Sequence, residues 1–212
     1  MIPMEDQLKT GTTTVGLVCK DGIVLAADKR ATAGSMIVDK RAEKVHIISD
    51  DFAVTIAGGV SDAQLVIKLI KAELKLKELR TNKKPSAKEA ANLLGGILYG
   101  NIRRPTMILS IAHFLLGGKD SSGLYLYDLF PDGSVTKIKD FVSSGSGSVF
   151  ALGVLETQYR PDMSSEEGVK LAIKSISTAL QRDSCSGNGI DVVVVKEQDI
   201  KRVFHKELEI SL

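Results

Sequence analysis

The sequence predicts an α+β fold, a four-layer αββα sandwich in which two helix pairs enclose two antiparallel sheets. Three observations support this prediction: strands and helices occur in blocks, short apolar segments are separated by tight-turn residues, and three helical segments open with a capping-box pattern. A parallel βαβ protein would instead alternate single strands with single helices. The blocks therefore favour antiparallel sheets, each covered on one face by a helix pair.

The first block is rich in β-strand signals. Apolar and β-branched segments are separated by turn residues at 20–22 and 50–51. We expect four strands there, at residues 12–18, 22–28, 45–49 and 52–57.

Two helices are expected next, separated by Pro85. The pattern Ser61-x-x-Gln64 opens the first, which runs to about residue 79, and Ser86-x-x-Glu89 opens the second, which runs to about residue 99. In each case, apolar residues recur at helical spacing after the opening serine.

In the second half of the chain we expect strands, then two helices, then strands again. The expected strands are 106–112, 124–127, 134–138, 190–195 and 202–205. The expected helices are 148–159, which ends before Pro161, and 164–182, which opens with the capping box Ser164-x-x-Glu167.

Composition excludes several functions. The chain has 212 residues, 43% of them apolar, and 28 basic against 26 acidic side chains, which indicates one globular domain with a sizeable core. The formal charge of +2 gives no electrostatic reason to expect a nucleic-acid or membrane partner. No apolar leader and no apolar segment long enough to cross a bilayer are visible, so we expect a cytoplasmic protein.

Histidine and cysteine are scarce. There are three His and two Cys, and neither a Cys-x-x-Cys nor a His-x-x-x-His pair occurs. A structural zinc site and a thioredoxin-like centre are therefore excluded, and we expect no bound metal. We expect Cys19 and Cys185 to be small, reduced core residues.

The usual nucleophile motifs are missing too. The sequence has no Gly-x-Ser-x-Gly elbow, and its glycine pairs lack the Lys-Ser or Lys-Thr of a phosphate-binding loop. A threonine whose own α-amino group acts as the base remains possible, and this chemistry needs a peptide bond that can be cut just before that threonine. Gly11-Thr12-Thr13-Thr14 meets the requirement, although threonine runs are also common in strands.

Six segments that occur in order make this signal specific. They are Gly11–Val18, Gly22–Thr32, Lys44, Ile56–Gly59, Ser144–Ser148 and Arg182–Gly187. This set resembles the catalytic β subunits of the 20S proteasome, most closely the archaeal ones, from residue 11 to about residue 195. The resemblance implies an N-terminal-nucleophile hydrolase fold and a threonine endopeptidase that degrades unfolded proteins to short peptides without a cofactor.

The resemblance also implies a role for individual residues. The nucleophile is Thr12, the buried acid Asp28, the lysine Lys44, the second acid Asp183, the supporting hydroxyls Ser146 and Ser186, and the oxyanion-hole N–H that of Gly58. A free α-amine has a pKa near ~8, so part of it is neutral and can accept the hydroxyl proton of Thr12. Lys44 would lower that pKa and stabilise the alkoxide, while Asp28 would hold Lys44 in place.

Activity is expected to require processing between Gly11 and Thr12. While that bond is intact, the nitrogen of Thr12 is an amide and cannot act as a base. The resemblance therefore implies an inactive zymogen in which residues 1–11 are a propeptide that Thr12 itself removes, leaving 12–212 as a single domain.

The resemblance places a substrate pocket beside the nucleophile. Its lining residues would be Ala31, Ala42, His46, Ile56, Val60 and Gln64. This largely apolar set favours cleavage after large apolar side chains, a chymotrypsin-like preference. Val60 stands where alanine is common in the family and His46 where an apolar residue is frequent, and both departures could narrow the pocket or change its preference.

The resemblance implies a set of partners. They are other β subunits in a seven-membered ring, a second β ring, two rings of α subunits, an ATPase that acts indirectly, and unfolded polypeptide as substrate. Two alternatives stay open, a catalytically silent ring subunit and a small-molecule amidase on the same fold. The intact set of Gly11, Thr12, Asp28 and Lys44 argues against a silent subunit.

Overall fold

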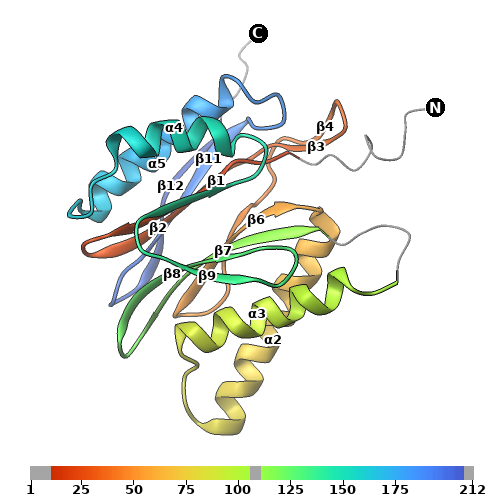
Figure 1. Ribbon diagram of the computed structural model, residues 1–212, viewed down its shortest axis with the longest axis vertical. Coiled ribbons are helices and arrows are strands. Elements are labelled where there is room, and N and C mark those ends of the chain that lie inside the picture. The colour runs from red at the N-terminus through yellow and green to blue at the C-terminus, as the bar shows by residue number, and fades with distance from the viewer. Residues whose placement is uncertain (1–10, 106–110, 208–212) are drawn as a thin grey trace.

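The computed structural model describes residues 11–105 and 111–207 (Figure 1). Its helices are α2 (Val60–Thr81), α3 (Ala87–Ile102), α4 (Ser148–Gln158) and α5 (Ser165–Leu180). Its strands are β1 (Thr14–Cys19), β2 (Gly22–Asp28), β3 (Ala31–Ala33), β4 (Met36–Asp39), β5 (Val45–Ile47), β6 (Phe52–Gly58), β7 (Ala112–Asp120), β8 (Gly123–Leu129), β9 (Val135–Ile138), β10 (Phe141–Ser144), β11 (Gly189–Val195) and β12 (Ile200–Glu207). No helix among these residues is long and apolar enough to span a membrane.

Two five-stranded sheets form the centre of the fold. The first has the strand order β10-β1-β2-β11-β12 and the second the order β5-β6-β7-β8-β9, while β3 and β4 form a separate hairpin. All neighbouring strands in both sheets are antiparallel. Helices α4 and α5 cover the outer face of the first sheet, and α2 and α3 cover that of the second (Figure 1). The predicted αββα sandwich is confirmed.

Strand β2 shows why the sheets lie at the centre. All seven of its residues are buried, and their side chains alternate between two cores. Val24 and Ala26 pack in the core beneath α4 and α5, whereas Ile23, Leu25 and Ala27 pack in the core between the sheets. A third core joins the second sheet to α2 and α3.

Two of the three predicted capping boxes are confirmed, and one prediction is wrong. Ser86 and Ser164 each accept a hydrogen bond from the N–H of the glutamate three residues on, and each glutamate bonds back to the serine N–H. Ser61 does not cap α2. Strand β6 passes directly into the helix, so Gly59 is the N-cap and Ser61 already lies in the first turn.

The predicted end of the strand 106–112 is also wrong. Residues 106–110 of the expected strand 106–112 lie outside the described residues, and β7 continues to Asp120 where we expected a loop. Its two glycines, Gly117 and Gly118, allow close packing. A Cβ at Gly117 would lie 3.1 Å from side-chain atoms of Ile23 and Leu25, and one at Gly118 would lie 2.4 Å from the Phe52 ring.

Candidate active site

The start of β1 and the end of β2 bring Thr12, Thr13 and Asp28 together. Thr14 on β1 pairs with Ala27 on β2, so Thr13 lies beside Asp28. The Asp28 N–H donates to the Thr13 carbonyl at 3.1 Å, and the Thr13 N–H donates to Asp28 Oδ1 at 3.0 Å. Lys44 precedes β5 and therefore approaches from the second sheet.

Asp28 is a fully buried carboxylate with four donors. Its Oδ1 accepts from the Lys44 ammonium at 2.8 Å, in addition to Thr13 N–H. Its Oδ2 accepts from the backbone N–H of Gly187 at 2.8 Å and of Arg30 at 3.0 Å. These bonds satisfy both oxygens, as burial of a charge requires.

Lys44 connects this carboxylate to the predicted cleavage site. Burial lowers the pKa of the Lys44 amine below its ordinary value, although the charge and hydrogen bond of Asp28 oppose the shift. Lys44 Nζ also donates to the Gly11 carbonyl oxygen at 3.3 Å, and Thr12 Oγ1 donates to the same oxygen at 2.7 Å. An ammonium and a hydroxyl therefore converge on the carbonyl of the Gly11–Thr12 bond.

A second carboxylate organises the hydroxyl groups on the other side of Thr12. Asp183 Oδ2 accepts hydrogen bonds from Ser146 Oγ and Ser186 Oγ, both at 2.6 Å. The Thr12 N–H donates to Ser146 Oγ at 3.3 Å. Thr13, which we had not singled out, lies 2.7 Å from Ser186 through its own hydroxyl. The six predicted catalytic side chains thus belong to one hydrogen-bonded cluster.

Gly58 lies at the end of β6 and lines the same cavity as Thr12. We expected a glycine there so that backbone could approach a substrate. The structure gives a different reason. Its φ is +107°, and a Cβ would lie 2.3 Å from the Ile111 carbonyl oxygen, so the backbone itself excludes a side chain.

A cavity of about 340 Å³ opens beside Thr12. All six predicted pocket residues line it: Ala31, Ala42, His46, Ile56, Val60 and Gln64. Sequence reasoning missed three further lining residues, Val38, Asp39 and Glu43. Two of them lie on β4, an exposed strand without the apolar alternation that would have predicted it.

Two ionisable side chains in the cavity wall influence each other. His46 Nε2 lies 3.0 Å from the Glu43 carbonyl oxygen, and burial lowers the pKa of His46 despite the opposing charge of Glu43. Burial would raise the pKa of Glu43, but a 2.6 Å hydrogen bond from Arg202 and the charge of His46 leave it below its ordinary value. Glu43 is therefore held as a carboxylate that Arg202 partly neutralises.

Two other neighbours of Gly11 come from distant parts of the sequence. Thr32 Oγ1 accepts a hydrogen bond from the Gly11 N–H at 3.1 Å. Cys185 is only half-buried, contrary to the core position we expected, and lies so close that a Cβ on Gly11 would be 1.7 Å from its own Cβ. Cys19 is a core residue, and burial, followed by the charges of Asp21 and Glu167, raises the pKa of its thiol to about 12.

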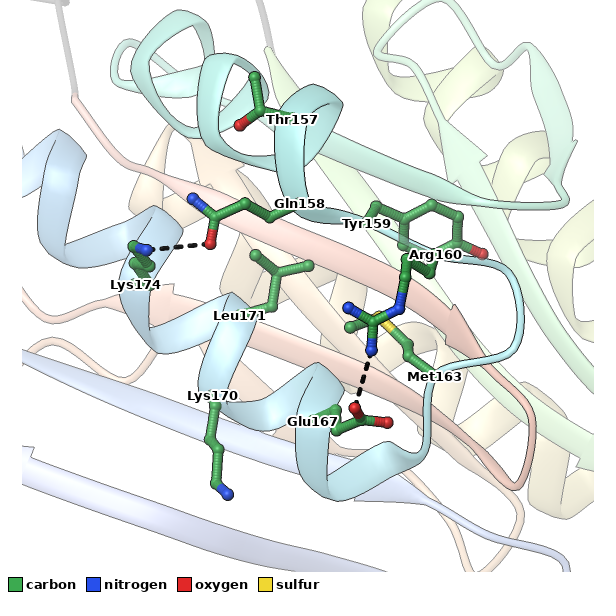
Figure 2. A pocket seen from close by; sticks show the side chains of 9 residues that line it. All are labelled: Thr157, Gln158, Tyr159, Arg160, Met163, Glu167, Lys170, Leu171 and Lys174. Carbon is green, nitrogen blue, oxygen red and sulfur yellow. Dashed lines mark hydrogen bonds and ion pairs between the residues drawn. The ribbon is translucent and has the colours of Figure 1, made fainter.

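A second hollow lies between α4 and α5, on the helical face of the first sheet (Figure 2). At about 440 Å³ it is larger than the cavity at Thr12, yet none of the predicted site residues lines it. Its polar side chains largely satisfy one another: Arg160 bonds Glu167 at 2.8 Å, and Lys174 bonds Gln158 at 2.9 Å (Figure 2). Thr12, Lys44 and Gly58 all line the smaller cavity, which is therefore the candidate site.

Known proteins resemble this chain over most of its length. The family model described as "Proteasome subunit" matches residues 8–195. The chain is 42% identical over 209 residues to a protein named "Proteasome subunit beta" from Archaeoglobus fulgidus, an alignment that covers 99% of this chain and 96% of that one. The corresponding protein of Ferroglobus placidus is 43% identical, with 99% and 98% covered. That of Methanocaldococcus vulcanius is 44% identical, with 93% and 87% covered.

Proposed function

The chain belongs to the proteasome subunit family, as a β subunit of the 20S core particle, and from this membership we propose that it is a threonine endopeptidase with Thr12 as its nucleophile. The observation that carries the proposal is the convergence of Thr12 Oγ1 and Lys44 Nζ on the carbonyl oxygen of Gly11. This arrangement places the hydroxyl and a buried cation at the bond that must be cut to free the Thr12 amine.

Processing would be the first reaction of this site. Thr12 Oγ attacks the Gly11 carbonyl carbon, and the Lys44 ammonium stabilises the oxyanion that develops on the carbonyl oxygen. The carbon–nitrogen bond then breaks, and the hydroxyl proton passes to the departing Thr12 nitrogen. Water hydrolyses the resulting ester, which releases residues 1–11 with a new carboxylate and leaves 12–212 with a free α-amine.

Hydrolysis of substrates would use that new amine. In its neutral form it accepts the Thr12 hydroxyl proton, while Lys44 keeps the amine pKa low and Asp28 holds Lys44 in place. The alkoxide attacks the substrate carbonyl, and the Gly58 N–H stabilises the oxyanion. The ammonium then protonates the leaving amine, and water hydrolyses the acyl ester on Thr12 Oγ.

The Asp183 cluster would orient the amine. Ser146 Oγ already accepts from the Thr12 nitrogen and donates to Asp183, so the same hydroxyl can hold the amine after cleavage. Ser186 gives the carboxylate a second fixed donor. With its proton positions fixed, the amine keeps the lone pair toward Thr12 Oγ that a general base requires.

The cavity would receive the side chain on the acyl side of the cut. Five of its thirteen lining residues are alanine, isoleucine or valine, and the Glu43 carboxylate is engaged by Arg202, which supports a preference for large apolar side chains, as in chymotrypsin-like cleavage. We also propose that the chain forms a seven-membered ring with other β subunits, stacked on a second β ring between two α rings. Family membership supports assembly into core rings.

The proposal is tested by peptide hydrolysis with the assembled protein. Peptides cleaved after phenylalanine, leucine, arginine or glutamate report both activity and preference, and Thr12→Ala and Lys44→Ala are compared with the wild type. We expect hydrolysis after the apolar residues and none in either variant. Hydrolysis by Thr12→Ala would exclude Thr12 as the nucleophile, and normal processing of Lys44→Ala would exclude the role of Lys44.

A further inference from the structure

Three polar side chains that the proposed reaction does not use join the two sheets. Ser144 ends β10 in the first sheet, whereas His113 on β7 and Asp128 on β8 belong to the second. Ser144 Oγ lies 2.7 Å from His113 Nδ1, and His113 Nε2 lies 2.5 Å from Asp128 Oδ1. One imidazole ring therefore connects a hydroxyl on one sheet to a carboxylate on the other.

Strand alternation places these side chains between the sheets. Leu115 packs in the inter-sheet core, so His113, two residues earlier, lies on the same face of β7, and Asp128 is the register partner of Leu115. Val142 packs against that core as well, so Ser144 faces it. Ser144 is 5% exposed and Asp128 6% exposed, which makes unsatisfied polar atoms costly there.

The burial of Ser144 argues against a second hydrolytic centre. A hydroxyl, an imidazole and a carboxylate in a row are also the parts of a serine nucleophile system. A serine that is 5% exposed offers no room for a substrate carbonyl, however, and neither Ser144 nor His113 lines the cavity at Thr12. The three side chains are therefore better placed to hold backbone than to attack a substrate.

The hydrogen positions follow from the chemistry of the three groups. A carboxylate only accepts hydrogen bonds, so the proton between His113 and Asp128 lies on Nε2. In the neutral ring Nδ1 is then an acceptor, and the Ser144 hydroxyl donates to it. The bond to Asp128 fixes the orientation of the ring, and the bond to Nδ1 fixes the Ser144 side chain.

Ser144 leads directly into the turn that contacts Thr12. A Cβ on Gly145, whose φ is +93°, would lie 2.1 Å from the Thr12 carbonyl oxygen, and Gly147 N–H donates to that oxygen at 3.3 Å. Ser146, between them, accepts from the Thr12 nitrogen at 3.3 Å. Because this turn packs so closely, a displacement of Ser144 is transmitted to Ser146.

We infer that His113, oriented by Asp128, is a positioning residue that fixes Ser144 and thereby the turn that presents Ser146 to the Thr12 nitrogen. The inference rests on the proposed function of Thr12 and assigns to two residues of the second sheet a role in supporting that site. It concerns the orientation of the amine and not the cavity that binds the substrate. Loss of His113 should therefore lower kcat and leave KM nearly unchanged.

The test measures kcat and KM for peptide hydrolysis by the assembled full chain. We expect His113→Ala to lower kcat roughly 10- to 100-fold, the effect of a small misplacement at a reacting group, with KM within about twofold of wild type. His113→Gln should restore most of kcat, because its amide can donate to Asp128 and accept from Ser144 at once. An unchanged kcat in His113→Ala, or a loss that His113→Gln does not restore, overturns the inference.

Ser144→Ala provides a second, independent arm. It should reproduce the fall in kcat, and combining it with His113→Ala should cost no more than the larger single change, since both break the same connection. Multiplying losses would overturn the inference. If His113→Ala does not assemble, Ser144→Ala decides alone, and an unchanged kcat in that variant overturns the inference.

Thr12→Ala, assayed in parallel, separates the two proposals. Hydrolysis that persists without Thr12 refutes the proposed function. Hydrolysis that depends on Thr12 but does not change in His113→Ala and Ser144→Ala refutes only the positioning role.

Discussion

Adding one methyl group at Gly11 should block processing through contact with Cys185. A Cβ at position 11 would lie 1.7 Å from Cys185 Cβ, so one of the two residues must move by about 1.7 Å to reach 3.4 Å, where ordinary van der Waals contact begins. A displacement of about 1 Å at a reacting carbonyl can slow a reaction about 100-fold, equivalent to about 2.7 kcal/mol of barrier. We expect Gly11→Ala to be processed at least about 100-fold more slowly.

The assay is an intact-mass time course after assembly, with Cys185→Gly as the matched control. Removing the Cys185 side chain leaves its Cα 2.9 Å from the added methyl carbon, so Gly11→Ala combined with Cys185→Gly should recover part of the rate. Chains of Gly11→Ala that do mature should hydrolyse peptides normally, because residue 11 has left. Processing of Gly11→Ala at the wild-type rate, or no recovery in the double variant, would refute the reasoning.

Three further changes have defined outcomes. Asp28→Asn leaves the Lys44 ammonium buried without a counter-charge and should lower the free energy of unfolding by about 3–5 kcal/mol in denaturant titrations, a loss that an unchanged midpoint would contradict. Val60→Ala enlarges the cavity and should therefore favour the larger phenylalanine side chain. The kcat/KM for cleavage after phenylalanine, divided by that for cleavage after leucine, should rise roughly tenfold. A value within twofold of wild type would show that Val60 does not determine the cleavage preference. The hydrogen bond from Lys77, with those from Ser86, lowers the pKa of Glu89 to about 2 from 4.5. The ionised Glu89 side chain therefore stabilises the fold fully above pH 4.5, and this contribution is lost as the pH falls toward 2. The difference in unfolding free energy between wild type and Glu89→Gln should shrink across that pH range. A difference that stays constant would contradict this prediction.

Features encoded by local pattern were predictable from the sequence. The block order of strands and helices led to the sandwich, and the capping boxes at Ser86 and Ser164 located two helix starts. Ordered motifs pointed to residues that the structure brings into one cluster, from strand ends and from the segment between α5 and β11. Local pattern and motif order therefore carried the fold class and the candidate site.

Features that depend on long-range contact were not predictable. The extension of β7 through its two glycines was not predicted, because the side chains that these glycines accommodate, from β2 and β6, lie elsewhere in the sequence. The exposed strand β4 was not predicted because apolar and polar residues do not alternate along it. His113 belongs to no sequence motif. It lies beside Ser144 only because the two sheets pack face to face.

The most direct test of Thr12 as processing and catalytic nucleophile is the intact mass of the assembled chain, wild type beside Thr12→Ala. We expect the wild-type chain to have lost residues 1–11 and to begin at Thr12 with a free amine, while Thr12→Ala keeps all 212 residues. A Thr12→Ala chain that is cut after Gly11, or an active wild-type chain that still carries residues 1–11, would contradict the mechanism.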